Sequence, residues 1–110
     1  MTLRFVSWNV NGLRALSAKP EWAWFAETKA DIVALQETKA NESQLSSDLL
    51  APSGWHASFC SSTVKKGYSG VCVYSRTEPL GIEKELPDPA LQGEGRLLHL
   101  EYPAFHFFNG

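Results

Sequence analysis

The feature that most constrains the fold of this chain is a strand, helix, strand pattern in its first third. Leu3 to Trp8 is a short run, apolar apart from Arg4, which predicts a strand. Pro20 suits the first position of a helix that we expect to end near Ala30. Ile32 to Leu35 has the length and composition of a strand buried on both faces. One face of the predicted helix follows a three-and-four spacing through Trp22, Phe25, Ala26 and Lys29.

Polar residues follow both predicted strands at their carboxyl ends. Asn9-Val10-Asn11-Gly12 interrupts the first apolar run with residues that favour turns, and Gln36-Glu37-Thr38 follows the second. The segment between them is long enough for a crossover, so we expect the strands to be parallel and adjacent, or nearly so. Their carboxyl ends then lie at one edge of the sheet. The sequence therefore predicts that Asn9 and Glu37 converge.

The rest of the chain predicts one more helix and then mainly strands. A helix is expected to begin at Asn41, with Gln44 as its capping-box partner and with Leu45 and Leu49 on one face. From Trp55 onward, short apolar or alternating runs are separated by residues that favour loops. The expected strands are Trp55 to Cys60, Gly70 to Ser75, Arg96 to Tyr102 and the terminal run that starts at Phe105.

The composition is that of one folded domain. Of the 110 residues, 44% are hydrophobic and 12% are aromatic, which is enough to form a core. Ten basic residues against twelve acidic ones give a net charge of -2, so the chain lacks the overall positive field of many nucleic-acid-binding domains. Any contact with a nucleic acid must therefore come from a local patch.

The sequence contains no pattern that directs the chain to a membrane or out of the cell. Cys60 and Cys72 lack the spacing of metal ligands and the density of a disulfide scaffold, so we expect buried thiols in a reducing cytosol. The chain begins with a strand pattern rather than a signal peptide, and no apolar stretch approaches the roughly 18 residues of a membrane span. We therefore expect a soluble intracellular protein.

Asn9 and Glu37 together offer the oxygen ligands that a magnesium ion prefers. Mg²⁺ takes hard oxygen ligands and keeps several waters, so protein sites often supply only one or two carboxylates. Glu37 offers a charged carboxylate and Asn9 a neutral amide oxygen, each delivered from the end of a strand. Taken alone, an Asn after a strand is more often a turn residue, and a Glu there is more often a solvated surface charge.

Four short motifs, taken together, resemble a known enzyme family. They are Ser7-Trp8-Asn9-Val10-Asn11-Gly12-Leu13-Arg14-Ala15, Leu35-Gln36-Glu37-Thr38-Lys39, Gly67-Tyr68-Ser69-Gly70-Val71 and Glu94-Gly95-Arg96. Their order and separations closely resemble those of the exonuclease III family of abasic-site endonucleases, and the resemblance runs from Leu3 to Gly110. It implies a four-layer α/β sandwich of the endonuclease/exonuclease/phosphatase type. It also implies phosphodiester hydrolysis with Mg²⁺ or Mn²⁺, and double-stranded DNA with abasic sites or 3′ ends as the substrate.

The resemblance assigns roles to individual residues. It makes Asn9 and Glu37 metal-site residues, with Glu37 taking part in catalysis through the metal. The residues that it places on or near the DNA-binding face are Arg14, Lys39, Gly67 and Tyr68. The two cations can also be read as solvated surface charges, and the loop that contains Gly67 and Tyr68 as a solvated hairpin end. Relatives carry Asn or Asp at the position of Asn11, which leaves the number of metals open.

Two further sets of polar residues are expected to be structural. Arg96 begins an apolar strand and can pair with Glu94, which favours a scaffolding role over catalysis. His56, His99 and His106 lie in β-patterned runs without the spacing of metal ligands.

The resemblance further implies that residues 1–110 are the incomplete N-terminal part of a single nuclease domain. The family's remaining catalytic groups, a Tyr, an Asp and Asn of a later motif and an Asp-His pair, lie beyond the position that matches Gly110. The family's domain is roughly twice this length or more. We therefore expect the chain alone to be inert and to need the missing C-terminal half for activity. We also expect it to expose apolar surface that favours association or partial unfolding.

Three alternatives stay open beside the repair nuclease. A related phosphodiesterase could cut RNA, phosphoinositides or sphingomyelin, although the Gly-Tyr-Ser-Gly and Glu-Gly-Arg segments favour DNA repair. A noncatalytic DNA-binding module could retain the first half of the fold. A decayed sequence could keep the core and motifs by inheritance. For a repair nuclease we expect a cytoplasmic, nucleoid-associated location or a nuclear one, and no secretion.

Overall fold

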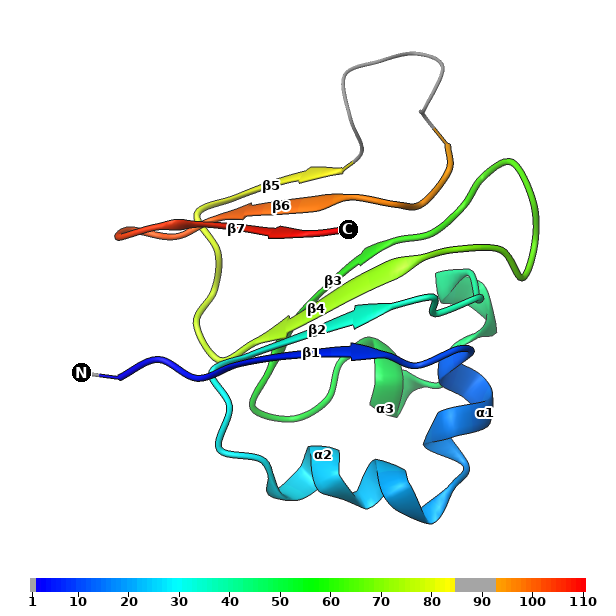
Figure 1. The fold of residues 1–110 in the computed structure, drawn as a ribbon, viewed down its shortest axis with the longest axis horizontal. Helices are drawn as coiled ribbons and strands as arrows, with labels where there is room; N and C mark the ends of the chain where they lie inside the picture. The colour runs from blue at the N-terminus through cyan, green and yellow to red at the C-terminus, as the bar shows by residue number, and fades with distance from the viewer. Residues whose placement is uncertain (1, 85–92) are drawn as a thin grey trace.

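In the computed structural model, which describes residues 2–84 and 93–110, two β-sheets face each other and short helices cover the outer face of the first sheet (Figure 1). The order of layers is helices, sheet, sheet. This arrangement supplies three layers of the expected four-layer α/β sandwich.

The first sheet contains the two parallel strands that the sequence predicted. Its strand order is β1-β2-β4-β3, with β1 and β2 parallel and the other two pairs antiparallel. The register of the parallel pair runs from Phe5 opposite Ile32 to Asn9 opposite Gln36. The prediction of adjacent parallel strands is therefore confirmed. The strands are β1 (Phe5–Asn9), β2 (Ile32–Gln36), β3 (His56–Cys60) and β4 (Val71–Ser75).

The second sheet is antiparallel and includes one strand that the sequence did not predict. Its order is β5 (Gly81–Lys84), β6 (Leu98–Glu101) and β7 (His106–Asn109). The unpredicted strand is β5, which carries a single large apolar residue, Ile82, and this side chain is 47% exposed. Because β5 lies at the edge of the sheet and buries little, it has no hydrophobic periodicity that sequence analysis could detect.

The helices are shorter than predicted. The helix expected to end near Ala30 is instead a 3₁₀ turn followed by a short α-helix that ends at Glu27, and Ala26 and Lys29 are exposed. The Arg76 guanidinium donates to the carbonyls of Thr28 and Ala30, so tertiary contacts stabilise an extended connection there. The helices are α1 (Leu13–Ser17), η1 (Pro20–Trp22), α2 (Ala23–Glu27), η2 (Glu42–Gln44) and α3 (Ser47–Leu50).

The predicted capping box is present, although the helix behind it is broken. The Asn41 side chain accepts from the backbone of Gln44, and the Gln44 side chain accepts from the backbone N–H of Asn41. This box caps only the single 3₁₀ turn η2, and α3 begins separately at Ser47. Leu45 and Leu49 are both buried, but Leu45 lies between η2 and α3 and therefore does not share a helix face with Leu49 as expected. None of the helices in the described part of the chain is long and apolar enough to cross a membrane.

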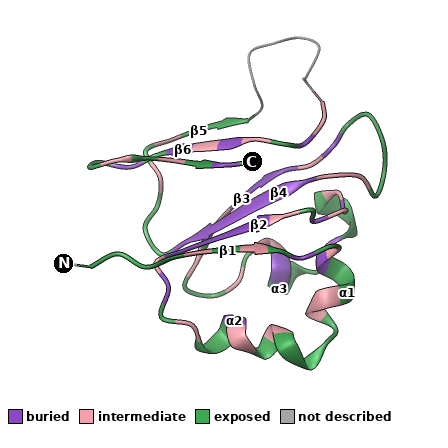
Figure 2. Cartoon of the chain, in the orientation of Figure 1, coloured by how far each residue is buried: buried purple, intermediate pink, exposed green. Residues whose placement is uncertain are grey.

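The core consists of two clusters, one on each face of the first sheet. Along β4, Cys72 and Tyr74 face the helices, whereas Val71 and Val73 face the second sheet. Strand β2 alternates in the same way, so both central strands are buried on both faces, as Figure 2 shows. This burial explains why their sequences read as continuous apolar runs. Cys60 is buried in the cluster between the sheets.

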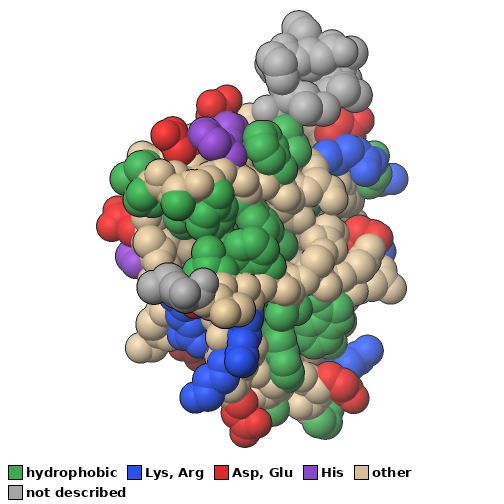
Figure 3. Space-filling view, turned by 60° about the vertical axis from the view of Figure 1, so that its left-hand side comes forward, with side chains coloured by type: hydrophobic (Ala, Val, Ile, Leu, Met, Phe, Trp, Pro, Cys, Tyr) green, Lys and Arg blue, Asp and Glu red, His purple; other side chains and the backbone are tan. Residues whose placement is uncertain are grey.

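An apolar patch is exposed at the end of the sandwich where β1 begins. Leu3 and Phe5 are 44% and 50% exposed and line a hollow of about 230 Å³ together with Pro103 and Phe105. Figure 3 shows hydrophobic side chains gathered on this side of the molecule. The Phe5 ring contacts both Phe105 and Phe107 at centroid distances of 5.8 and 5.5 Å. That the chain associates through such surface stays a prediction.

Candidate functional site

The carboxyl ends of β1 and β2 stay hydrogen bonded after the strands end. The N–H of Val10 donates to the Gln36 carbonyl at 3.0 Å, and the N–H of Gly12 donates to the Glu37 carbonyl at 2.8 Å. Leu13, the first residue of α1, donates to Thr38 at 2.9 Å. These bonds hold the two polar segments against each other and set where their side chains project.

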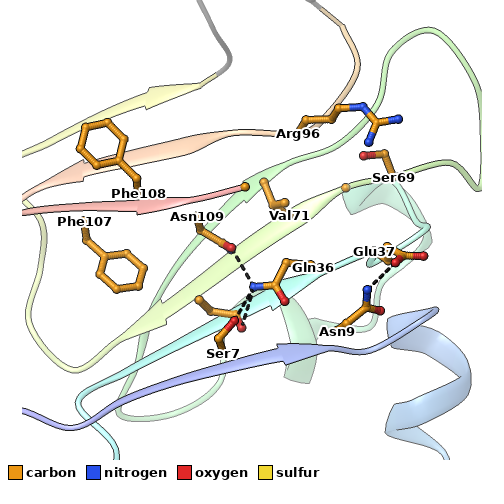
Figure 4. A pocket seen from close by; sticks show the side chains of 13 residues that line it. Ser7, Asn9, Gln36, Glu37, Ser69, Val71, Arg96, Phe107, Phe108 and Asn109 are labelled. Atoms are coloured by element: carbon orange, nitrogen blue, oxygen red, sulfur yellow. Dashed lines mark hydrogen bonds between the residues drawn. The ribbon is translucent and has the colours of Figure 1, made fainter.

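Asn9 and Glu37 lie in direct contact at this edge of the sheet. The amide Nδ2 of Asn9 donates to Oε2 of Glu37 (Figure 4), and Oδ1 of Asn9 accepts from the backbone N–H of Asn11 at 3.0 Å. Both side chains are exposed to solvent. The predicted convergence of these two residues is confirmed, while their role as metal ligands stays a prediction.

The backbone around this pair adopts an unusual conformation. Among the described residues, the non-glycine residues with positive φ are Asn11 (45°), Glu37 (54°), Lys39 (52°) and Ser69 (52°). A left-handed conformation is unfavourable for such residues and tends to occur at functional sites. Hydrogen bonds hold it in place: the N–H of Lys39 donates to the Ser69 carbonyl at 2.8 Å. Glu37 itself belongs to the Asn9–Glu37 contact, and Asn11 and Lys39 each lie two positions beyond one of its members.

Gly70 brings the third motif against the second. The N–H of Thr38 donates to the Gly70 carbonyl at 3.1 Å, and a Cβ on Gly70 would lie 2.2 Å from Oγ1 of Thr38. Gly70 also has a φ of 94°, which favours glycine. No larger residue fits here without moving the segment that carries Glu37.

Lys39 is the cation nearest to the Asn9–Glu37 pair. Its Nζ lies 2.6 Å from Oδ1 of Asn11 and 3.8 Å from Oε1 of Glu37. The structure therefore places Lys39 at the predicted site. Arg14 is exposed on α1, and no contact joins its guanidinium to Glu37.

Tyr68 of the third motif lies in contact with Arg96 of the fourth. The Arg96 guanidinium donates to the Tyr68 hydroxyl, and its Cζ lies 5.0 Å from the centre of the Tyr68 ring. The expected pairing of Arg96 with Glu94 is not among the contacts of the described residues. Gly67 is exposed in the same loop, with a φ of 68°.

The fourth motif is tied to the third through Gly95. Its carbonyl accepts from the N–H of Gly70 at 2.9 Å and from the Ser69 hydroxyl at 3.0 Å. A Cβ on Gly95 would lie 2.4 Å from the backbone nitrogen of Ser62, so only glycine permits this approach. These bonds carry Arg96 to the site, while its expected role as scaffolding rather than in catalysis stays a prediction. In the sequence, Gly95 and Arg96 stand directly before a predicted strand, but nothing there indicates that Tyr68 is the partner of Arg96.

All four motifs line one cleft of about 610 Å³ between the two sheets. Figure 4 shows Asn9 and Glu37 on one side of it and Arg96 and Ser69 on another, with β7 along its length. The polar side chains that line the cleft are Ser7, Asn9, Gln36, Glu37, Ser69, Arg96 and Asn109.

Asn109 is a structural member of the site that sequence analysis missed. It is only 3% exposed, and its Nδ2 donates to the carbonyls of Leu35 and Cys72 at 3.0 and 2.9 Å. Its Oδ1 accepts from Nε2 of Gln36 at 2.8 Å, and Gln36 also donates to the Ser7 hydroxyl at 3.0 Å. The side chain therefore joins β7 to the strand that precedes Glu37. The sequence offered one signal for this role, a polar residue that directly follows the apolar pair Phe107 and Phe108.

The donors at the cleft fit a hard divalent cation. Glu37 supplies a carboxylate and Asn9 an amide oxygen, and the open cleft leaves room for waters that Mg²⁺ retains. Among the described residues no group of three or more His, Cys, Asp or Glu side chains forms a denser metal site. The pair therefore suits Mg²⁺ or Mn²⁺ better than Zn²⁺, which prefers nitrogen and sulfur ligands.

The pKa shifts in the described residues belong to the core rather than to the cleft. Burial raises the pKa of the Cys72 thiol and of the Tyr74 hydroxyl far above their usual values. Burial also raises the pKa of Tyr102. Tyr74 donates to the Leu49 carbonyl at 2.5 Å and so links β4 to α3. These groups stay protonated and neutral near pH 7, which is consistent with a structural role.

Comparison with known proteins gives consistent matches along most of the chain. Residues 6–110 match the model of the Endonuclease/Exonuclease/phosphatase family. An exodeoxyribonuclease of Bacillus subtilis is 40% identical over 101 residues, which are 91% of this chain and 38% of the relative. The DNA repair nuclease APEX1 of Danio rerio is 38% identical over 104 residues, 94% of this chain and 34% of the relative. The chain thus spans less than two fifths of either relative.

A solved structure shows the same arrangement of strands and helices. An AP endonuclease from Archaeoglobus fulgidus superposes with a TM-score of 0.81 at 26% identity. The match covers 97% of this chain and 40% of that structure. The fold described above is therefore the fold of one part of that enzyme.

Proposed function

Because this chain belongs to the endonuclease/exonuclease/phosphatase family, we propose that it forms the metal-binding and DNA-binding part of a DNA repair nuclease. The substrate class is double-stranded DNA with abasic sites or 3′ ends, and the reaction is phosphodiester hydrolysis. The observation that carries the proposal is the convergence of four separate motifs on one cleft. The names of the two similar repair nucleases support the choice of DNA.

Asn9 and Glu37 would hold the divalent cation. When bound, Mg²⁺ or Mn²⁺ supplies a Lewis acid that offsets negative charge on a phosphate group. Glu37 contributes the charged ligand, and its left-handed backbone is held in place through neighbouring hydrogen bonds. Asn9 keeps the Glu37 carboxylate oriented toward the cleft through their mutual hydrogen bond.

The cations around the cleft would bind DNA phosphates. Lys39 is 39% exposed at its side chain and can reach a phosphate beside Glu37. Arg96 presents a planar guanidinium that suits a phosphate, and Tyr68 holds that guanidinium in place. Arg14 and Gly67 are exposed and complete the proposed DNA-binding face.

The 110-residue chain itself is proposed to bind without turnover. Among the described residues that line the cleft, no side chain is a His, Asp, Cys or Tyr that could transfer a proton near Glu37. A noncatalytic DNA-binding module is the second candidate, and the same observation favours it. The two candidates differ in whether Glu37 binds a metal.

Titration of Mn²⁺, followed by electron paramagnetic resonance, tests the metal site directly. Coulomb's law in water predicts that removing a carboxylate about 4 Å from a divalent ion costs about 2 kcal/mol. We therefore expect Glu37→Gln to weaken Mn²⁺ binding at least about tenfold. The matched control is Glu27→Gln, which removes an exposed carboxylate at the end of α2 and should leave binding unchanged.

The outcome separates the candidates. Equal Mn²⁺ affinity of the Glu37→Gln and Glu27→Gln chains would overturn the metal site and leave the noncatalytic module. A parallel incubation with an abasic duplex tests the second part of the proposal, because Mg²⁺-dependent nicking that Glu37→Ala abolishes would refute binding without turnover.

A further inference from the structure

A second hollow, lined by lysines, lies beside the free edge of β3. It measures about 670 Å³, and the loop between β3 and β4 contributes to both hollows: residues 61–66 line this one, and Ser69 and Gly70 line the cleft. Three lysines line it, Lys65 and Lys66 from this loop and Lys84 from the end of β5. We call this hollow the lysine groove. Both sheets contribute to it, so the groove exists only in the folded chain.

Within the described residues, little negative charge compensates the lysines of the groove. All three lysines are exposed, and none forms an ion pair with a carboxylate of residues 2–84 or 93–110. Glu42 is the single acidic side chain among the described lining residues. In a chain with a net charge of -2, such a concentration of cations is a local departure from the overall charge.

The loop that carries two of these lysines is held by hydrogen bonds. The buried Ser62 hydroxyl accepts from the N–H of Lys65 at 3.2 Å and donates to the Gly93 carbonyl at 3.1 Å. The N–H of Thr63 donates to the same carbonyl at 2.7 Å. The backbone that carries Lys65 is therefore anchored to Gly93, which precedes the second strand of the second sheet. This anchoring reduces the conformational entropy that the loop loses when it binds a ligand.

Tyr68 connects the lysine groove to the cleft. Arg96, which lines the cleft, lies 5.0 Å from the centre of the Tyr68 ring. Lys65, which lines the groove, lies 6.0 Å from the same centre. One cation of the cleft and one of the groove thus lie against the same ring.

We propose that the lysine groove binds backbone phosphates of the DNA duplex at a distance from the cleft, with Lys84 as a phosphate contact supplied by the second sheet. This inference rests on the proposed function and extends its DNA-binding face past Tyr68. A nucleic-acid backbone suits the groove because it presents several phosphates in a row, and the three groove lysines together with Arg96 offer several cations. Each phosphate that a lysine neutralises releases counterions, so binding through the groove must depend on salt.

The test is the salt dependence of duplex binding by the 110-residue chain. Binding of a fluorescently labelled duplex is followed by anisotropy between about 50 and 200 mM NaCl, the range in which phosphate contacts change affinity strongly. Loss of one contact lowers the slope of log K against log salt by about 0.9. At about 0.1 M salt, a change of about 0.9 in this slope corresponds to about eightfold weaker binding.

The variant is Lys84→Gln, and its matched control is Lys29→Gln on the connection between α2 and β2. Both remove one charge from an exposed lysine, so neither is expected to affect folding. We expect the shallower slope and the weaker binding for Lys84→Gln only. As a second variant, Glu42→Gln removes the acidic side chain of the groove and should tighten binding.

The outcomes separate this inference from the proposed function. Equal slopes for the Lys84→Gln, Lys29→Gln and unsubstituted chains would overturn the lysine groove while leaving the cleft intact. A chain that binds Mn²⁺ through Glu37 but shows no affinity for the duplex would overturn both the DNA-binding face and the groove. A normal Mn²⁺ titration of the Lys84→Gln chain would show that any loss of DNA affinity does not come from the metal site.

Discussion

Replacing Asn109 should weaken the attachment of the second sheet to the first. This side chain makes two donated and one accepted hydrogen bond across the sheets, and it is 3% exposed. Each such bond contributes about 0.5–1.5 kcal/mol net, so Asn109→Ala should lower the free energy of unfolding by about 1.5 to 4.5 kcal/mol. This is a large part of the stability of a small domain, typically about 5–15 kcal/mol.

Urea denaturation followed by tryptophan fluorescence measures this loss. The chain has four tryptophans, and Trp8 and Trp22 lie in the cluster between the first sheet and the helices. An unchanged m-value would show that the midpoint reports stability rather than a change in the compactness of either state. The measurement is made at low protein concentration, because association through the exposed patch around Phe5 is predicted.

A double-mutant cycle with Gln36→Met isolates the contact that joins the sheets. Met has a similar volume to Gln but cannot donate to Oδ1 of Asn109, so the cycle removes the 2.8 Å hydrogen bond between the two side chains. We expect a coupling energy of about 0.5–1.5 kcal/mol. A loss below about 1 kcal/mol for Asn109→Ala, or a coupling within about 0.3 kcal/mol of zero, would refute the reasoning.

Two further predictions follow from the site and the core. Lys39 attracts Glu37 across 3.8 Å, and because both side chains are more than a third exposed, this attraction amounts to about 0.2–1 kcal/mol. A bound cation competes with Lys39 for Glu37, so Lys39→Gln should strengthen Mn²⁺ binding up to about fivefold in the Mn²⁺ titration. The same substitution should weaken binding of the DNA duplex. An unchanged or weaker Mn²⁺ affinity would argue against competition between lysine and metal. Burial raises the pKa of Tyr74 above its usual value of 10.0, so below about pH 10 both states hold the proton and stability is unaffected. Above that pH the unfolded state releases the Tyr74 proton first, so the free energy of unfolding of the unsubstituted chain should fall as the pH rises. Compared with the Tyr74→Phe chain, the additional fall should be about 1.4 kcal/mol per pH unit. Urea titrations of both chains at a series of pH values would measure it.

The sequence predicted the elements whose residues are buried in a regular pattern. Strands β1 and β2 were recognisable because both are apolar runs that end in polar turn residues, and the crossover length implied their parallel pairing. The contact between Asn9 and Glu37 followed from that pairing alone. The roles proposed for Arg14, Lys39, Gly67 and Tyr68 rest on family resemblance and await measurement.

The sequence failed where long-range contacts override local preference. The helix after Pro20 ends at Glu27 because Arg76, 46 and 48 residues away from its acceptors, stabilises an extended connection. Strand β5 is held by pairing with β6 rather than by a hydrophobic face of its own. Arg96 was expected to be able to pair with Glu94, but its guanidinium donates to Tyr68, because the bonds of Gly95 to Ser69 and Gly70 bring the two segments together.

The sequence by itself therefore determined the local elements, the parallel pair and the place where its polar ends meet. These depend on side-chain periodicity and on turn residues that lie close together in the chain. Only the tertiary structure decided how the second sheet closes the cleft and forms the lysine groove. Asn109 bonds to Leu35 across 74 residues, and Lys84 joins Lys65 from a different sheet. Such contacts follow from how two twisted sheets pack, and no local pattern specifies that packing.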